Sequence, residues 1–215
     1  MDLLVLSNGS SSEWQFSIRS MYSSLINNGH IERNKFIWKL KMQIKSKIFM
    51  WFLFKGVILT KDNLARRNWN GSKTCCFFFM KNETIQHILF DCHITKFLWR
   101  IVYISFGLKP PDSISNVVGN WLGGVDSNIK NLIFIGASAL CQALWLSRND
   151  VMFDKSPNES YMQVLFRAAH WLRFWAHLQK CEEHKEILYS ACRNLEITVI
   201  QIFANYGWRF TKILQ

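Results

Sequence analysis

The sequence predicts a mainly α fold: a helical domain with a small cysteine-bearing insertion, followed by a C-terminal helical region. Two observations predict it. Apolar residues recur at helical spacing on both sides of the insertion. A chain of 215 residues that is 49% apolar and 15% aromatic also has ample material for a core. The aromatic content argues against a disordered chain.

The N-terminal half combines helical and extended patterns. Residues 16–27 place apolar side chains on one helical face, and Asn and Gly residues follow. Residues 36–43 alternate apolar and basic side chains, which favours a strand or an extended segment. Residues 46–56 predict a short buried helix that ends at Gly56, and Thr60 can N-cap the next helix.

A domain boundary is expected after the helical pattern at residues 93–106. The paired prolines Pro110 and Pro111 follow that pattern, and proline excludes a continuing helix. We therefore expect one domain at residues 13–108 and a separate helical region at 112–215.

Three helices are predicted in the C-terminal half. The apolar run at 132–147 is shorter than the about 18 to 20 residues that a membrane span needs, so we expect a buried helix. Residues 156–159 have the form of a capping box, which predicts a helix from Pro157 to about Lys180. A further helix is expected at about 184–204.

The positive charge of the chain is concentrated in one segment. The formal net charge is +11, and residues 33–73 contain eleven Lys and Arg against one acidic residue, Asp62. Such an excess favours an anionic partner, nucleic acid above all, bound through its phosphates without sequence-specific readout. The candidate contact residues are Lys39, Lys41, Lys45, Lys47, Arg66 and Arg67.

Three tryptophans, Trp38, Trp51 and Trp69, lie among these cations in the sequence. Aromatic side chains beside basic ones can stack on the bases of single-stranded nucleic acid. Aromatics in an apolar segment are also ordinary core residues, and we favour this second role, with the lysines contacting phosphate from the surface.

The cysteine-bearing segment predicts a metal site with one ligand missing. A zinc knuckle needs four ligands, two on a short turn and two near the start of the following helix. Cys76, His87 and Cys92 provide three of them. A C-x2-C turn would place the fourth ligand three residues after Cys76, where the sequence has Phe79. Because Cys75 adjoins Cys76, we expect its thiol to point away from the vacant corner.

Two outcomes stay open at this knuckle. Zinc can be held by three protein ligands with weakened affinity, with water in the fourth position. Alternatively, the run Phe77, Phe78 and Phe79 turns inward and replaces the metal with a small apolar core.

Several long blocks of the sequence resemble one known family: "FSIRSMY", "IWKLKMQIKSKIFMWFLFKGVILTKDNLARRNWNGSK", "ETIQHILFDC" and "ALWLSRNDVMFDKSP". They are similar to the zinc-binding domain downstream of reverse transcriptase in plant non-LTR retrotransposons. The resemblance implies a C-x2-C-x7-H-x4-C ligand pattern, whose positions here are Cys76, Phe79, His87 and Cys92. It also implies a role in holding nucleic acid beside the polymerase.

No catalytic function is expected. The chain contains no adjacent aspartates of the kind that polymerases use for metal ions, and no Gly-rich phosphate loop. We therefore predict a non-catalytic nucleic-acid-binding module, intracellular (nuclear or cytoplasmic) rather than secreted, without a membrane or small-molecule partner. The alternative is a helical interaction or structural remnant that binds neither metal nor nucleic acid.

Overall fold

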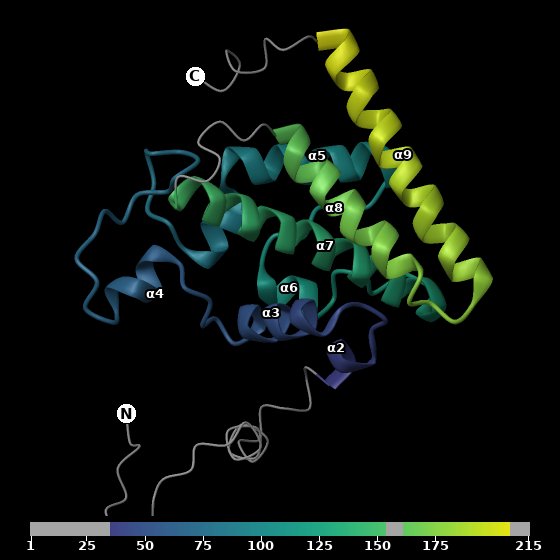
Figure 1. Cartoon of the computed structure of the whole chain (residues 1–215), viewed down its shortest axis with the longest axis horizontal. Coiled ribbons are helices and arrows are strands. Elements are labelled where there is room, and N and C mark those ends of the chain that lie inside the picture. The colour runs from purple at the N-terminus through teal and green to yellow at the C-terminus, as the bar shows by residue number, and fades with distance from the viewer. Residues whose placement is uncertain (1–34, 154–160, 207–215) are drawn as a thin grey trace, which may run out of the picture. The chain divides into compact units, whose positions relative to one another are not determined.

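The computed structural model describes residues 35–153 and 161–206 (Figure 1). Helices make up most of these residues, and none of them belongs to a strand, so the mainly α prediction is confirmed. From Phe36 onward the described residues belong to one compact unit. The helix expected at 16–27 and the capping box at 156–159 lie outside the described residues.

The first described segment differs from its prediction. Residues 36–43 were expected to be extended, but α2 (Lys35–Lys39) is a helical turn. The ring of Phe36 packs 5.0 Å from that of Phe134, and Ile37 and Leu40 are buried. Helical spacing lets these apolar side chains pack into the core together. This tertiary packing outweighs the local alternation of apolar and basic residues.

The next two helices begin and end close to their predicted positions. α3 (Ile44–Phe54) ends before Gly56, which adopts the left-handed φ of +71° that glycine tolerates. α4 (Lys61–Ala65) has Thr60 as its N-cap residue, but the Thr60 hydroxyl donates to Asp62 instead of capping the helix. The cap comes from a distant residue, since the Glu83 carboxylate accepts the Lys61 N–H at 3.0 Å.

The middle of the chain contains a π turn and two helices. The π turn η2 (His87–Asp91) leads into α5 (His93–Phe106), which confirms the helix predicted there. Gly107 ends α5 with a φ of +68°. The short α6 (Ile114–Val118) was not predicted. Ser113 caps its N-terminus, because the Ser113 hydroxyl accepts a hydrogen bond from the Asn116 N–H at 3.1 Å.

Helix α7 (Ser127–Met152) lies at the centre of the core, where it packs against α3, η2 and α8 (Tyr161–Ala176). It contains the apolar run predicted to be a buried helix. Among the described residues, α7 is the one helix long and apolar enough to cross a membrane by length and composition. In the structure, 61% of its most apolar window is buried, as expected of a core helix.

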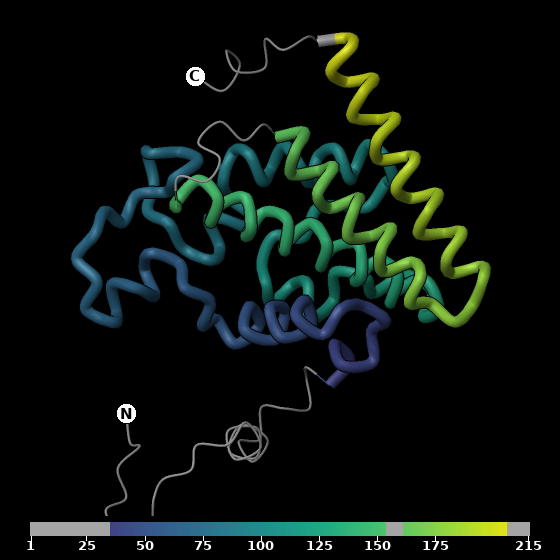
Figure 2. The backbone as a smooth tube through the Cα atoms, viewed as in Figure 1, coloured from purple at the N-terminus to yellow at the C-terminus, as the bar shows by residue number. Residues whose placement is uncertain are grey.

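Helices α8 and α9 (Glu182–Tyr206) lie side by side in opposite directions (Figure 2). α8 packs against α7 as well as α9, and it buries Ala169, Leu172 and Trp175. The apolar face of this helix is therefore covered largely by the chain itself.

The expected division between 13–108 and 112–215 is not a division of the described structure. α5 packs against α8 and α9, while α3 and η2 pack against α7. The residues on both sides of Pro110 and Pro111 thus share one core. Pro110 is exposed and Pro111 is buried, so the two prolines lie in a connection within one body rather than in a linker between independent bodies.

Candidate metal centre and basic groove

A short hairpin positions the first cysteine. Thr74 and Asn82 form an antiparallel bridge, and the Cys75 N–H donates to the Lys81 carbonyl at 2.8 Å. A second bond of 2.8 Å joins the Glu83 N–H to the Lys73 carbonyl. This pairing fixes the register of the hairpin, and the Cys75 side chain is fully buried.

The π turn explains the spacing between the second and third candidate ligands. The Cys92 N–H donates to the His87 carbonyl at 2.7 Å, which is an i to i+5 bond. In an α-helix, residues five apart point in different directions, because the period is about 3.6 residues. The wider π turn brings His87 and Cys92 toward the same point, so H-x4-C becomes a usable ligand pair.

Cys75, His87 and Cys92 form one buried cluster. Their ligand atoms all lie within 4.8 Å of one another. Ligand atoms around one tetrahedral zinc ion are about 3.5 to 4 Å apart, so a small adjustment would suffice to coordinate the ion. His87 is 5% exposed, and its Nε2 has no hydrogen-bond partner among the described residues. A buried unpaired nitrogen beside two thiols fits a metal ligand.

The cluster differs from the prediction at its first ligand. Cys76 was expected to face the metal, but the structure places its neighbour Cys75 there. The Cys76 thiol lies 4.0 Å from the Arg148 carbonyl of α7. The expectation that Cys75 would point away was wrong, because hairpin pairing, not proximity in sequence, decides which of two adjacent side chains turns inward.

The residue at the C-x2-C spacing also changes when it is counted from Cys75 instead of Cys76. Phe79 is 75% exposed, so it does not replace the metal with an apolar core. Counted from Cys75, the C-x2-C position is Phe78, whose half-buried ring lies 4.7 Å from that of His93. Phe78, rather than Phe79, is thus the residue at the C-x2-C spacing from the cysteine that faces the cluster.

The three thiols of this segment influence one another. Hydrogen bonds from Cys76 and Cys92 lower the pKa of Cys75 well below that of a free thiol. The same bonds raise the pKa of Cys76 and of Cys92, and burial adds to that rise. These hydrogen bonds favour the thiolate form of Cys75, which is the form in which a cysteine binds a metal ion.

A buried ion pair joins the hairpin to α7. Arg148 donates to the Glu83 carboxylate from Nε at 3.0 Å and from a terminal nitrogen at 2.5 Å. Glu83 is fully buried and Arg148 is 3% exposed. Arg148 also lies over the Trp145 ring, 5.0 Å from its centroid. The end of the hairpin is therefore held to the central helix by a charge-assisted contact.

The candidate nucleic-acid contacts lie in different environments. Five of the six are exposed, and Lys47 is half-buried and donates to the Trp38 carbonyl at 3.0 Å. Burial and the nearby Lys41 lower the pKa of Lys47. Lys47 therefore has a structural contact of its own, whereas the other side chains reach solvent: Lys39, Lys41, Lys45, Arg66 and Arg67.

Lys45 and Arg67 belong to one groove. Its volume is about 650 Å³, and its walls come from α3, from the segment after α3 and from the C-terminal end of α7. Phe52 and Phe153 in its lining are 39% and 66% exposed. The remaining apolar and aromatic residues of the lining are Ile48, Phe49, Val57, Ile58, Leu59, Leu64 and Trp145.

The groove and the hairpin share Arg148. The Arg148 side chain lines the groove and pairs with Glu83, and the Arg148 backbone carbonyl lies against the Cys76 thiol. Arg148 therefore joins the groove lining to the end of the hairpin that carries Cys75.

Comparison with known families identifies the segment that carries the cluster. Residues 16–99 match the family zf-RVT, described as zinc-binding in reverse transcriptase. The match includes all three clustered ligands. The chain carries a retrotransposon-related zinc-binding domain of the reverse-transcriptase type.

The chain is also similar to part of a curated plant protein. The chain is 27% identical over 94 residues to an Arabidopsis thaliana protein provisionally named a ribonuclease H protein. The matched residues are 41% of this chain and 15% of that protein. No solved structure matches the chain.

Sequence reasoning missed several residues of the zinc-binding domain and its surroundings. Cys75 was passed over because the two adjacent cysteines cannot be ranked without the hairpin register. Arg148 lies in the polar sequence of residues 147–150 near the end of α7, so its burial against Glu83 carried no distinct local signal. Phe153 carried no local signal, because its groove is assembled from segments far apart in the chain.

Proposed function

We propose that the chain is a non-catalytic module that binds nucleic acid in the groove beside its zinc-binding domain. The observation that carries the proposal is the composition of that groove: its lining includes two exposed aromatic rings, Phe52 and Phe153, and two exposed cations, Lys45 and Arg67. Single-stranded nucleic acid presents the complementary groups, flat bases and charged phosphates.

The groove residues divide these two tasks. Phe52 and Phe153 offer exposed ring faces on which bases of any sequence can stack. Lys45 and Arg67 are exposed and can neutralise phosphates, while Lys41 and Lys39 extend the positive charge along the preceding segment. Stacking and phosphate contacts do not discriminate strongly between bases, so we expect little sequence preference.

The proposed metal has a structural role. Cys75, His87 and Cys92 would hold a zinc ion and tie the hairpin to the π turn. When bound, the ion would supply a cross-link between these two segments. That cross-link would keep Glu83 in place, and with it the Arg148 side chain that lines the groove.

One observation favours a different partner for the same groove. α3 exposes Ile44, Ile48 and Phe52 along one face, and an apolar stripe of this kind suits a protein helix. The nucleic-acid proposal predicts that charge controls affinity, whereas an apolar helix would bind almost independently of salt.

The test is a salt titration of the whole chain with a fluorescent single-stranded RNA. Changing Lys45→Glu together with Arg67→Glu should weaken binding by about tenfold or more at low salt. It should also reduce the slope of log affinity against log salt by about 1.4, because each lost phosphate contact accounts for about 0.7. Fluorescence anisotropy measures both.

The matched control is Lys96→Glu with Arg193→Glu. This pair makes the same change in net charge at two exposed positions outside the groove lining, so its slope should change far less. Equal losses in the two variants, or no binding of RNA at low salt, would reject the groove as a nucleic-acid site.

A further inference from the structure

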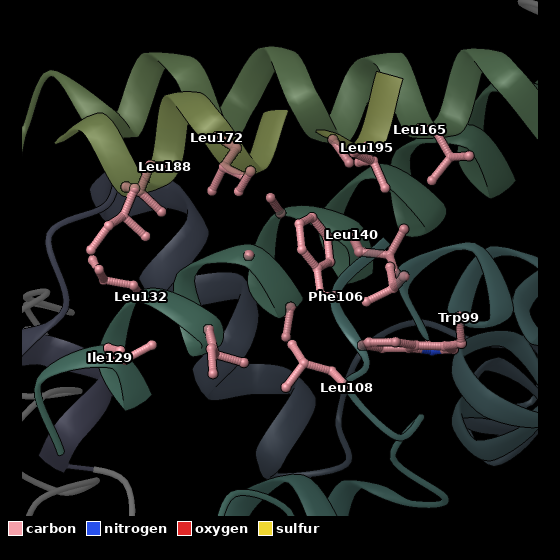
Figure 3. A pocket seen from close by; sticks show the side chains of 18 of the residues that line it. Trp99, Phe106, Leu108, Ile129, Leu132, Leu140, Leu165, Leu172, Leu188 and Leu195 are labelled. Carbon is pink, nitrogen blue, oxygen red and sulfur yellow. The ribbon is translucent and has the colours of Figure 1, made fainter. Parts of the chain in front are cut away.

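A second cavity, distinct from the basic groove, lies among four helices. Its volume is about 290 Å³, and its lining comes from α5, α7, α8 and α9. Figure 3 shows labelled side chains from each of these helices, such as Trp99, Leu140, Leu165 and Leu195, around the same space. Protein interiors contain few voids larger than a water molecule, so a space of this size calls for an explanation.

The walls offer nothing polar to a ligand. The described residues of the lining are aliphatic or aromatic, apart from one glycine. The two indole N–H groups among them are already used: Trp99 donates to the Leu89 carbonyl at 3.0 Å and Trp121 to the Lys109 carbonyl at 2.7 Å. A buried water needs two to four polar partners, so these walls do not favour water.

The space arises in part at Gly136, inside α7. A Cβ atom added there would meet nothing within 4 Å, apart from its own neighbours in the helix. Glycine in a helix interior costs about 1 kcal/mol relative to alanine. The chain therefore has a poor helix former at a position where a larger side chain would fill the cavity.

Two residues of the cavity lining lie near helix ends. Phe106 at the end of α5 and Ile129 at the start of α7 both line it, and they are 36% and 43% exposed. The cavity is therefore lined in part by residues that also reach the surface.

We propose that this cavity binds a neutral, apolar small molecule of about two fused aromatic rings. The size follows from the volume, which is about twice that of apolar cavities known to take up benzene. The apolar class follows from the lining, because a charged or hydrogen-bonding ligand would lose its hydration without gaining a partner. The proposal is independent of metal and nucleic acid, since no candidate ligand or groove cation lines the cavity.

The test uses the whole chain and the neutral fluorescent probe N-phenyl-1-naphthylamine. The probe should bind saturably with one site per chain, and naphthalene should displace it. Naphthalene-1-sulfonate has the same rings with a charge, so it should compete at least about tenfold less well.

Gly136→Leu should abolish probe binding, because its side chain would occupy the cavity. Gly124→Leu is the matched control, since a Cβ there also meets nothing within 4 Å but Gly124 does not line the cavity. The control should bind the probe as the wild type does. If Gly136→Leu does not fold, Gly136→Ala is used instead, and a lower affinity of this variant for the probe would support the proposal.

Three results would overturn the proposal: no saturable binding by the wild type, unchanged binding by a folded Gly136→Leu variant, or equal competition by naphthalene and its sulfonate. Loss of binding in Phe153→Ser would also overturn it, because it would place the probe in the basic groove.

Discussion

The side chain of Cys75 occupies the position that decides where the metal centre can form. Its sulfur faces His87 and Cys92, while the adjacent Cys76 lies against the Arg148 carbonyl. Two neighbouring thiols of equal chemistry therefore have different roles, and the difference comes from the hairpin pairing of the Cys75 N–H with Lys81.

Replacing one cysteine at a time should separate these roles. Cys75→Ser should abolish stoichiometric zinc binding, because it removes a buried ligand from a site that has only three. Cys76→Ser should retain zinc. Elemental analysis of the purified variants measures the metal content, and loss of zinc from both variants to the same extent would contradict this assignment.

The fourth position can be tested in the opposite direction. Phe78→Cys completes a C-x2-C turn that begins at Cys75, so it should raise zinc affinity well above that of the wild type. Phe79→Cys is the control, and it should have little effect because that position is 75% exposed. A chelator competition titration ranks the two variants, and the reverse order would restore Cys76 as the first ligand.

Among the elements, the contact between the hairpin and α7 depends on the Glu83–Arg148 pair. Glu83 caps α4 through the Lys61 N–H and binds Arg148 with the same carboxylate oxygen. One buried side chain therefore connects α4, the hairpin and the central helix. Its Oε1 atom accepts hydrogen bonds from both the Lys61 N–H and the Arg148 guanidinium.

Changing Glu83→Gln should lower the free energy of unfolding by about 3 to 5 kcal/mol, because it leaves the Arg148 charge buried without a counterion. Asp150→Asn is the control, because Asp150 lies on α7, the helix that carries Arg148. Its ion pair with Arg167 is partly exposed, so its loss should cost less than about 1 kcal/mol. Urea unfolding followed by circular dichroism measures both, and similar losses would show that burial does not distinguish the pairs.

The helices differ in how well the sequence predicts them, for physical reasons. α5 and α7 are long enough for apolar periodicity to show, and Gly56 marks the region where α3 ends. α2 was not predicted, because its helical turn depends on the packing of Phe36 against Phe134, almost one hundred residues away. The choice of Cys75 likewise depends on hairpin register, which periodicity does not contain.

Over the whole molecule, the core does not respect the boundary suggested by the two prolines. Leu98, Trp99 and Ile101 of α5 are almost fully buried. α5 itself packs against α8 and α9. Sequence reasoning places a boundary at a local break in the helix pattern, but only the three-dimensional contacts show whether two segments share a core.

A fragment of residues 1–108 should therefore not fold cooperatively. Truncation would expose the apolar face of α5, at about 1.5 to 3 kcal/mol for each large side chain, and would remove the partner of Glu83. Circular dichroism and thermal unfolding of the fragment, compared with the whole chain, test this expectation. A sharp unfolding transition in the fragment would show that the N-terminal part is an independent domain.

The position of Arg148 has a consequence for how the two proposed sites communicate. It lines the groove and pairs with Glu83 at the end of the hairpin that carries Cys75, so a change in the hairpin can reach the groove through this side chain. Such linkage is reciprocal: if zinc strengthens RNA binding by some factor, RNA strengthens zinc binding by the same factor. In a cell, a metal centre linked to the groove in this way would respond to nucleic acid as well as to the zinc supply.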